Sequence, residues 1–240
     1  MFGEGGRMRT CLPLFILAMA VAVAAPASAA TRNFGINSFD KIRVDGPFKV
    51  RVTTGVAPYA KASGSTEALD RVAIDVQGRT LIVHPNRSSW GGYPGKDPGP
   101  VEISIGTHEL TAAWLNGSGG LDIDKVRGLA FGLSAQGSGA VTIGKAEVDQ
   151  LNVGLAGNAS ATVSGKAGKL TAVIRGISSL DAAALVTKNA SIGAEGAATV
   201  KANILNEARL NGSGPATIAL TGGPACTTRV SGSVTVSGCR

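Results

Sequence analysis

The stretch NGSGGLDID at residues 116–124 decides the architecture, because the chain repeats it at a nearly constant interval. QGSGAVTIG follows at 136–144, NGSGPATIA at 211–219 and SGSVTVSG at 231–238, with weaker copies at 156–164 and 195–203. One glycine in each copy marks the interval, and successive spacings are 20, 20, 19, 20, 16 and 20 residues: Gly117, Gly137, Gly157, Gly176, Gly196, Gly212 and Gly232. Such a period is typical of a stacked repeat, in which each copy contacts its neighbours.

Apolar and polar residues alternate on both sides of these glycines. The positions two residues before them are Leu115, Ala135, Leu155, Ile174, Ala194, Leu210 and Val230. The positions four residues after them are Leu121, Val141, Ala161, Leu180, Val200, Ala216 and Val236. A period of two predicts two short strands per repeat, with apolar side chains inward and polar ones outward. Because one strand pair cannot bury its apolar face alone, we expect the copies to stack into a common core.

The predicted fold is all-β: a right-handed parallel β-solenoid with rungs of about 20 residues over 107–240. Glycine accepts positive φ, so the Gly-Ser-Gly phrases are suited to the corners. Seven rungs at the usual strand spacing of ~4.8 Å make a rod of roughly 34 Å. An antiparallel sandwich would also alternate with period two, but it has no reason to keep this glycine interval.

Residues 31–106 form a less regular N-terminal β region, which the sequence leaves open as either early rungs or a cap. Clean alternation at 42–52 and at 72–83 predicts strands there. The segment 65–71 predicts one helical turn, with Ser65 or Thr66 as its N-cap. Residues 86–100 combine glycine and proline and predict an exposed loop or hinge.

Residues 1–30 are predicted to be a signal peptide. Arg7 and Arg9 precede an apolar run at 12–25, and Ala27-Ser28-Ala29 matches the small-residue pattern of a cleavage site. An uncleaved anchor helix is the alternative. Export predicts that the protein lies in the periplasm, on the cell surface or outside the cell of a bacterium. No stable membrane span is expected after cleavage.

The charge is basic but dispersed. The whole chain carries +7, and +6 remains without Glu4, Arg7 and Arg9. No block of like charges occurs, so nucleic acid is not a predicted partner. Cys226 and Cys239 remain after export into a compartment that permits disulfides, and we predict that they form one.

Several stretches resemble a known family. FDKIRVDGPFKVRVTTG at 39–55, LDRVAIDVQGRTLIVH at 69–84 and the later Gly-Ser-Gly rungs are similar to the putative autotransporter adhesin, head GIN domain family. The resemblance covers residues 37–239. It implies an exported β-helical protein of the bacterial envelope and supplies no catalytic residue.

No catalytic, cofactor-binding or metal-binding residue is predicted. His84 and His108 stand apart from any cysteine or clustered carboxylate. Residues 139–145 have the glycine and lysine spacing of a phosphate-binding loop, but Ala146 replaces the required serine or threonine. Asp122 lies in a row with a 20-residue period, which cannot build the regular oxygen cage of calcium-binding β-rolls.

Four residues of the 86–100 loop are the predicted ligand-binding residues: Arg87, Trp90, Tyr93 and Lys96. Exposed aromatic side chains stack on sugar rings or anchor a partner. Alternatively, Trp90 folds back and plugs the end of the core. Trp114 lies on an outward row and is expected beneath this loop.

The predicted function is non-enzymatic. Stacked polar rows favour adhesin-like binding of an envelope polysaccharide or a surface protein along one face of the rod. The alternative is a lyase or hydrolase acting on polysaccharide from a β-helix scaffold. Charged outward residues are few. Two pairs of opposite charges lie one rung apart and could pair as exposed surface contacts: Arg175 with Glu195, and Asp181 with Lys201. The sequence predicts no oligomeric state.

Overall fold

The computed structural model describes residues 30–86 and 99–240, and strands account for 73% of these residues. In chain order the elements are β1 (Ala30–Phe34), β2 (Lys41–Asp45), β3 (Lys49–Thr54), β4 (Tyr59–Gly64), α1 (Thr66–Asp70), β5 (Val72–Gln77), β6 (Thr80–Pro85), β7 (Glu102–Thr107), β8 (Ala112–Gly117), β9 (Gly120–Gly137), β10 (Ala140–Gly157), β11 (Ser160–Arg175), β12 (Ser179–Glu195), β13 (Thr199–Ser213), β14 (Thr217–Thr221), β15 (Ala225–Ser231) and β16 (Thr235–Ser237).

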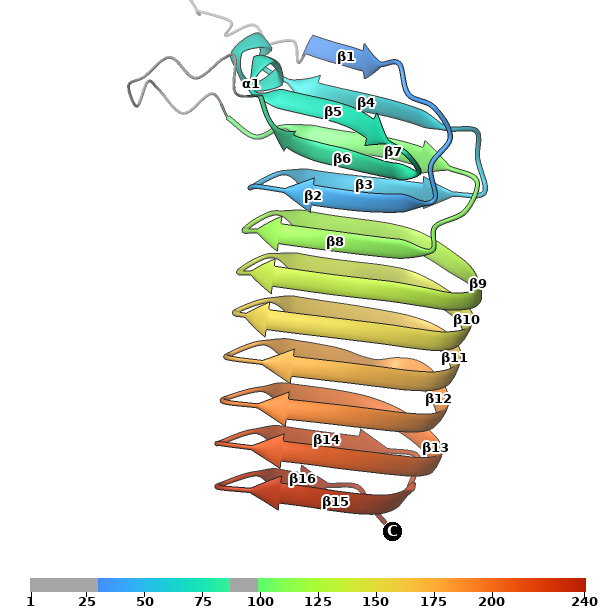
Figure 1. Cartoon of the computed structure of the whole chain (residues 1–240), viewed down its shortest axis with the longest axis vertical. Helices are drawn as coiled ribbons and strands as arrows, with labels where there is room; N and C mark the ends of the chain where they lie inside the picture. The colour runs from blue at the N-terminus through green and yellow to red at the C-terminus, as the bar shows by residue number, and fades with distance from the viewer. Residues whose placement is uncertain (1–29, 87–98) are drawn as a thin grey trace, which may run out of the picture.

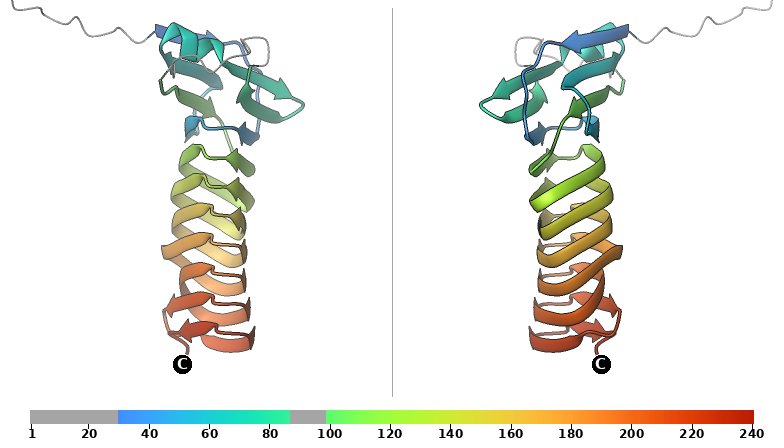
Figure 2. Two further views of the ribbon diagram at one scale, coloured as in Figure 1. Left: turned by 90° about the vertical axis from the view of Figure 1, so that its left-hand side faces the viewer. Right: turned by 90° about the vertical axis from the view of Figure 1, so that its right-hand side faces the viewer.

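A parallel β-solenoid of about six turns forms the body of the molecule, which confirms the predicted fold class. Each of β9 to β13 contains two straight segments joined by a wide bend, and narrow turns connect one strand to the next (Figure 1). Neighbouring strands from β9 to β13 pair in parallel along both segments, while β8 pairs with the second segment of β9 and β3 pairs with the first. The two segments therefore build two sheets that face each other across a slender core, as the side views show (Figure 2).

The predicted inward columns are present. Leu115, Ala135, Leu155 and Ile174 are register partners on successive strands, and each is at most 2% exposed. On the other sheet a second column of register partners is buried in the same way: Leu121, Val141, Ala161, Leu180 and Val200. Side chains of this size leave room for only one layer between the sheets, so the rod is narrow.

Glycines with positive φ stack at the narrow turns, but one of the predicted members is wrong. Gly214, not Gly212, lies next to Gly196, so the last two intervals are each 18 residues. Leu210 accordingly pairs with Ile192 rather than with Ala194. A slip of two residues keeps every side chain on its own face, so the alternation alone could not reveal it.

The N-terminal region begins inside the rod and then covers its end. β2 and β3 pair in parallel with β8 and β9, and the Gly46 amide donates to the Asn116 carbonyl at 2.8 Å. β6 and β7 pair in parallel with the other edges of β2 and β3. At the top of the rod in Figure 1, the pairing is antiparallel: β1 pairs with β4, β4 with β7 and β5 with β6. The division of the chain at residue 106 stays a prediction.

The segment between β7 and β8 passes the β2–β3 rung, and hydrogen bonds hold this segment in place. The buried hydroxyl of Thr107 donates to the carbonyl of Phe39 at 2.6 Å. The Thr111 amide donates to the carbonyl of Asp40 at 2.7 Å. These contacts hold β8 beneath β2, which positions the outer surface described below.

The predicted helical turn is α1, with Ser65 as its N-cap. The Ser65 hydroxyl accepts a hydrogen bond from the Ala68 amide at 3.1 Å, which satisfies an amide that the helix itself leaves unpaired. Residues 1–29 of the predicted signal peptide lie outside the described residues. Within 30–86 and 99–240, no helix is long and apolar enough to cross a membrane.

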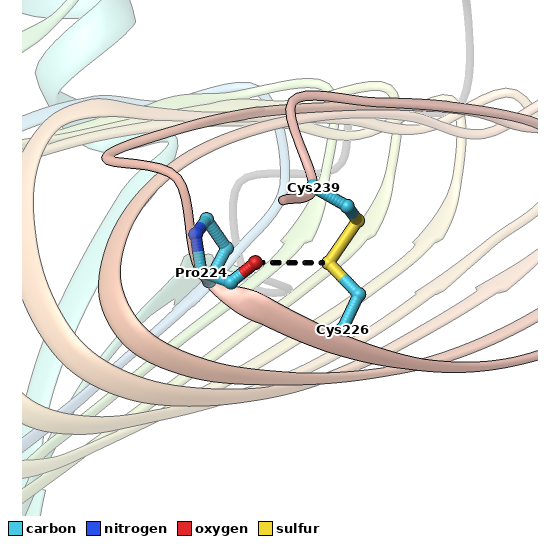
Figure 3. Close-up of a disulfide and its surroundings, with 3 residues drawn as sticks. All are labelled: Pro224, Cys226 and Cys239. Atoms are coloured by element: carbon cyan, nitrogen blue, oxygen red, sulfur yellow. Dashed lines mark hydrogen bonds between the residues drawn. A yellow bond between two sulfur atoms is a disulfide. The ribbon is translucent and has the colours of Figure 1, made fainter.

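The predicted disulfide between Cys226 and Cys239 is present at the C-terminal end of the rod (Figure 3). Its two Cα atoms are 5.7 Å apart. Cys226 packs against the core, and its sulfur lies 3.7 Å from the carbonyl oxygen of Pro224. The bridge ties β15 to the residues that follow β16, so both strands of the last rung are joined covalently.

Candidate binding groove on the outer face

The predicted ligand residues Arg87, Trp90, Tyr93 and Lys96 lie outside the described residues, so their role stays a prediction. The other aromatic residue that the sequence placed outward, Trp114, is described. It lies on β8, a strand on the near side of the rod in Figure 1, and the residue is partly exposed. The candidate site is therefore built around Trp114.

Small residues follow Trp114 along the rod. Its column of register partners continues through Ser134, Gly154 and Val173 on β9, β10 and β11. A hollow of about 260 Å³ lies over this column and the next one. We call it the Trp114 groove, and its lining residues are Ala112, Trp114, Gly132, Leu133, Ser134, Asn152, Val153, Gly154, Thr171 and Val173.

Two glycines in the groove have no conformational reason to be glycine. Neither Gly132 nor Gly154 has the positive φ of the turn glycines. A Cβ at either position would meet no atom closer than 3.9 Å. In the middle of a strand, glycine is unfavourable because it loses the most conformational freedom and packs nothing. What these glycines do provide is the depth of the groove, since any side chain there would fill it.

The column continues past Trp114 in the other direction. Its next register partner is Arg43 on β2, followed by Ile82 on β6. A second hollow of about 410 Å³ lies there, lined by Arg43, Asp45, Gln77, Ile82, His84 and Pro85. Both hollows thus share one outward column, and Arg43 and Trp114 stand side by side where they meet.

The polar groups of this second hollow are paired with one another. Arg43 Nε lies 2.9 Å from Asp45 Oδ2, and the Asn116 amide nitrogen donates to Asp45 Oδ1 at 2.7 Å. His84 Nε2 lies 2.9 Å from Asp75 Oδ2, while its Nδ1 lies 3.0 Å from the Pro85 carbonyl oxygen. Both ring nitrogens of His84 therefore have an oxygen within hydrogen-bond distance.

The chemistry of the Trp114 groove is that of a binding surface. None of its lining side chains is ionisable. The lining exposed in the groove is almost wholly apolar, and its polar residues are Ser134, Asn152 and Thr171. Among the described residues, no group of three or more His, Cys, Asp or Glu side chains is placed to hold a metal ion. Nearby, Arg175 Nε lies 3.0 Å from Glu195 Oε2, so this pair forms. Asp181 and Lys201 are register partners, but within the described residues no ion pair joins them.

A third hollow lies at the wide bends and differs in character. Its volume is about 420 Å³, and it combines lysines with apolar residues such as Val186 and Leu205. Beside it, Glu147 lies between two cations. Hydrogen bonds from Lys145 and then Arg127 lower the pKa of Glu147 to about 2. This cluster is exposed and mixed in charge, and we regard it as part of the solvated surface.

Sequence reasoning found Trp114 on an outward row but did not find the groove. The groove residues are separated by about 20 positions in the chain, and each is an ordinary small residue in its own rung. A detectable indication existed in the repeat itself. The register partners of Gly132 on the neighbouring rungs are Ala112 and Asn152, and those of Gly154 are Ser134 and Val173, so both glycines stand where neighbouring rungs carry side chains.

The stacked rungs, the covered N-terminal end and the open outer face define the protein as a parallel β-solenoid. Residues 38–224 match the family model described as "Putative auto-transporter adhesin, head GIN domain". The match spans more than half of the chain, so this protein belongs to that family, which confirms the resemblance. No curated protein matches the chain.

Solved structures share the architecture. A putative adhesin from Bacteroides fragilis superposes with a TM-score of 0.80 at 17% identity, covering 88% of this chain and 97% of that one. A putative lipid binding protein from Parabacteroides distasonis has a TM-score of 0.68 at 21% identity, covering 88% and 96%. A putative adhesin from Parabacteroides merdae has a TM-score of 0.67 at 16% identity, covering 88% and 95%. At these identities the likeness concerns the fold.

Proposed function

We propose that this protein is an exported, adhesin-like binding protein that holds an extended glycan in the Trp114 groove. The observation that carries the proposal is an aromatic side chain at one end of a groove that Gly132 and Gly154 keep open without any backbone need for glycine. Membership of an adhesin family supports a surface role. The predicted signal peptide and the disulfide fit an oxidising compartment outside the cytoplasm.

A linear glycan suits this groove better than a protein surface does. The groove follows one column of side chains along the rod axis, across strands that repeat every ~4.8 Å. A sugar ring can pack its apolar face on the indole of Trp114, while its hydroxyls reach Asn152 and Thr171. A stable protein partner needs on the order of 1,000 Å² or more of buried surface, so it would have to cover far more of this face than the ten residues that line the groove.

Binding without turnover is the proposed mode of action. Glycoside hydrolysis ordinarily requires two carboxyl groups on either side of the scissile bond. No carboxylate lines the Trp114 groove. In the neighbouring hollow, Asp45 is occupied by Arg43 and Asn116, so it is poorly placed for proton transfer. These features support a binding protein over the alternative of a polysaccharide lyase or hydrolase.

The test is binding of the purified protein to a panel of polysaccharides by calorimetry, with variants that change the groove alone. Trp114→Ala should weaken binding at least about tenfold, since buried aromatic anchors dominate such contacts. Gly154→Val should weaken it similarly by filling the groove, because a Cβ there meets only open space. The matched control is Gly120→Val, at a strand position on the opposite sheet whose nearest atom is also 3.9 Å away.

Equal affinities for the wild type, Trp114→Ala and Gly154→Val would refute the groove as the site. A Trp90→Ala, Tyr93→Ala double variant tests the loop hypothesis in the same assay. Loss of binding in that double variant alone would move the site to the loop. Hydrolysis of any polysaccharide, abolished by one Asp or Glu substitution, would overturn the non-enzymatic assignment.

A further inference from the structure

The two outer faces of the solenoid carry different charge. The face with Trp114 is formed by β2, β8, β15 and the second segments of β9 to β13. It has six cations and three anions, a net charge of +3: Lys41, Arg43, Lys169, Arg175, Arg209 and Arg229 against Asp45, Glu195 and Glu207. The opposite face is formed by β3, β14, β16 and the first segments before the wide bends, residues 120–124, 140–144, 160–164, 179–183 and 199–203. It is neutral: Lys49, Arg51 and Lys201 against Asp122, Asp124 and Asp181.

Three of the cations without an ion-pair partner stand beyond the two ends of the Trp114 groove, and the fourth, Lys169, stands beside it on β11, two residues before Thr171. Arg43 and Arg175 are paired with carboxylates on this face, whereas no ion pair within the described residues includes Lys41, Arg209 or Arg229. Arg229 belongs to the same outward column as Trp114, six strand steps away. At the usual strand spacing this distance is about 29 Å.

The lower end of the face is a cluster of two arginines. Arg209 lies in the column next to that of Asn211, and Asn211 is the register partner of Arg229 on the following rung. Both guanidinium groups are exposed. A guanidinium binds a carboxylate or sulfate with two parallel hydrogen bonds, so it recognises such groups specifically as well as attracting their charge.

From this arrangement we infer that the ligand of the Trp114 face is an anionic polysaccharide, whose sugar rings carry carboxylates or sulfates. This inference rests on the proposed function, because it assumes that a glycan lies along the groove. The polymer runs parallel to the rod axis, with an uncharged stretch of ring surface on Trp114. Its acidic groups reach Lys41 at one end and Arg209 and Arg229 at the other.

The experiment compares two polymers that differ only in charge: a polyuronate and its fully methyl-esterified form. At low ionic strength the wild type should bind the free acid at least about tenfold more tightly, and added salt should reduce this preference because it screens exposed charges. The Arg209→Gln, Arg229→Gln double variant should lose the preference while still binding the ester. The matched control, Lys166→Gln with Lys188→Gln, removes the same charge from the wide bends and should keep the preference.

Each result decides one of the two proposals. If Trp114-dependent binding occurs but the acid and the ester bind equally, the anionic assignment is wrong and the proposed function stands. If the Lys166→Gln, Lys188→Gln variant loses the preference instead, the acidic groups bind at the bends and the inference is overturned. If neither these polymers nor any of the panel bind, the proposed function fails and the inference fails with it.

Discussion

A Cβ atom on Gly137 would lie 2.6 Å from the carbonyl oxygen of Gly117, one rung away in the glycine column. That carbonyl accepts a hydrogen bond from the Ser138 amide at 3.0 Å, so it cannot turn aside. The same contact recurs at Gly157, where a Cβ would lie 2.9 Å from the Gly137 carbonyl oxygen. The narrow turns therefore exclude side chains for two reasons, positive φ and contact with the neighbouring turn.

Gly137→Ala should accordingly destabilise the protein by at least about 3 kcal/mol, since backbone strain and a steric clash act together. The control is Gly55→Ala. Gly55 also has positive φ, +79°, but has open space around its Cβ position, so only the strain of roughly 1–2 kcal/mol applies. Urea denaturation followed by circular dichroism measures both. Equal losses in the two variants would contradict the role of the inter-rung contact.

Val153→Asp should destabilise the fold by several kcal/mol, because Val153 is 3% exposed and the core offers a carboxylate no partner. Asn152→Asp changes the neighbouring outward residue to the same carboxylate and should be almost neutral. Thermal unfolding of the two variants checks the assignment of inward and outward positions. A stable Val153→Asp protein would refute the inward column.

Loss of the Cys226–Cys239 disulfide should loosen the last rung. The loop-entropy model gives ~3 kcal/mol for a bridge of this span. Because each rung of a solenoid contacts only its neighbours, the effect should be local. In a Cys226→Ser, Cys239→Ser variant, amide hydrogen exchange should therefore accelerate by about a hundredfold in β15 and β16, and little in β9. Titration of two free thiols in the unfolded, unreduced wild type would contradict the bridge itself.

Glu147 should titrate well below an ordinary glutamate. Its Oε1 lies 2.6 Å from Lys145 Nζ and its Oε2 lies 2.9 Å from Arg127 Nε, and these contacts lower its pKa from 4.5 to about 2. Because the folded pKa is the lower one, the stabilisation is fully present above pH 4.5 and is lost as the pH falls through about 2. An NMR titration of the Glu147 carboxyl carbon gives the value directly.

The ion pairs of Glu147 with Lys145 and Arg127 are exposed. They should therefore stabilise the folded protein only slightly, and this contribution should fall as salt is added. In high salt the NMR midpoint should move back toward 4.5. Glu147→Gln should have its largest stability difference from the wild type at neutral pH and none near pH 2. A midpoint near 4.5 in low salt would show that the two cations do not hold this carboxylate.

Much of the fold was predictable because it depends on local rules. Period-two alternation assigned Leu115 and Ala135 to the core, and the recurring glycines showed that the chain turns at regular intervals. The helical turn followed from the capping chemistry of Ser65. The disulfide followed from two cysteines that share one rung. Each of these inferences uses residues that are near one another in the sequence.

Three features were decided only by the tertiary structure. In the last rungs the glycine of the narrow turn is Gly214 and not Gly212. The alternation could not show this, because a slip of two residues leaves both faces unchanged. The chain inserts the β2–β3 rung between β6–β7 and β8–β9, an order that no local pattern encodes.

The third is the site. Trp114, Ser134, Gly154 and Arg229 become one column only when the rungs stack, and the charge difference between the two faces arises in the same way. The sequence by itself determined which side chains point inward and which outward. Which outward side chains become neighbours was decided by the parallel pairing, because strand register sets distances between residues that the chain separates by about a full turn.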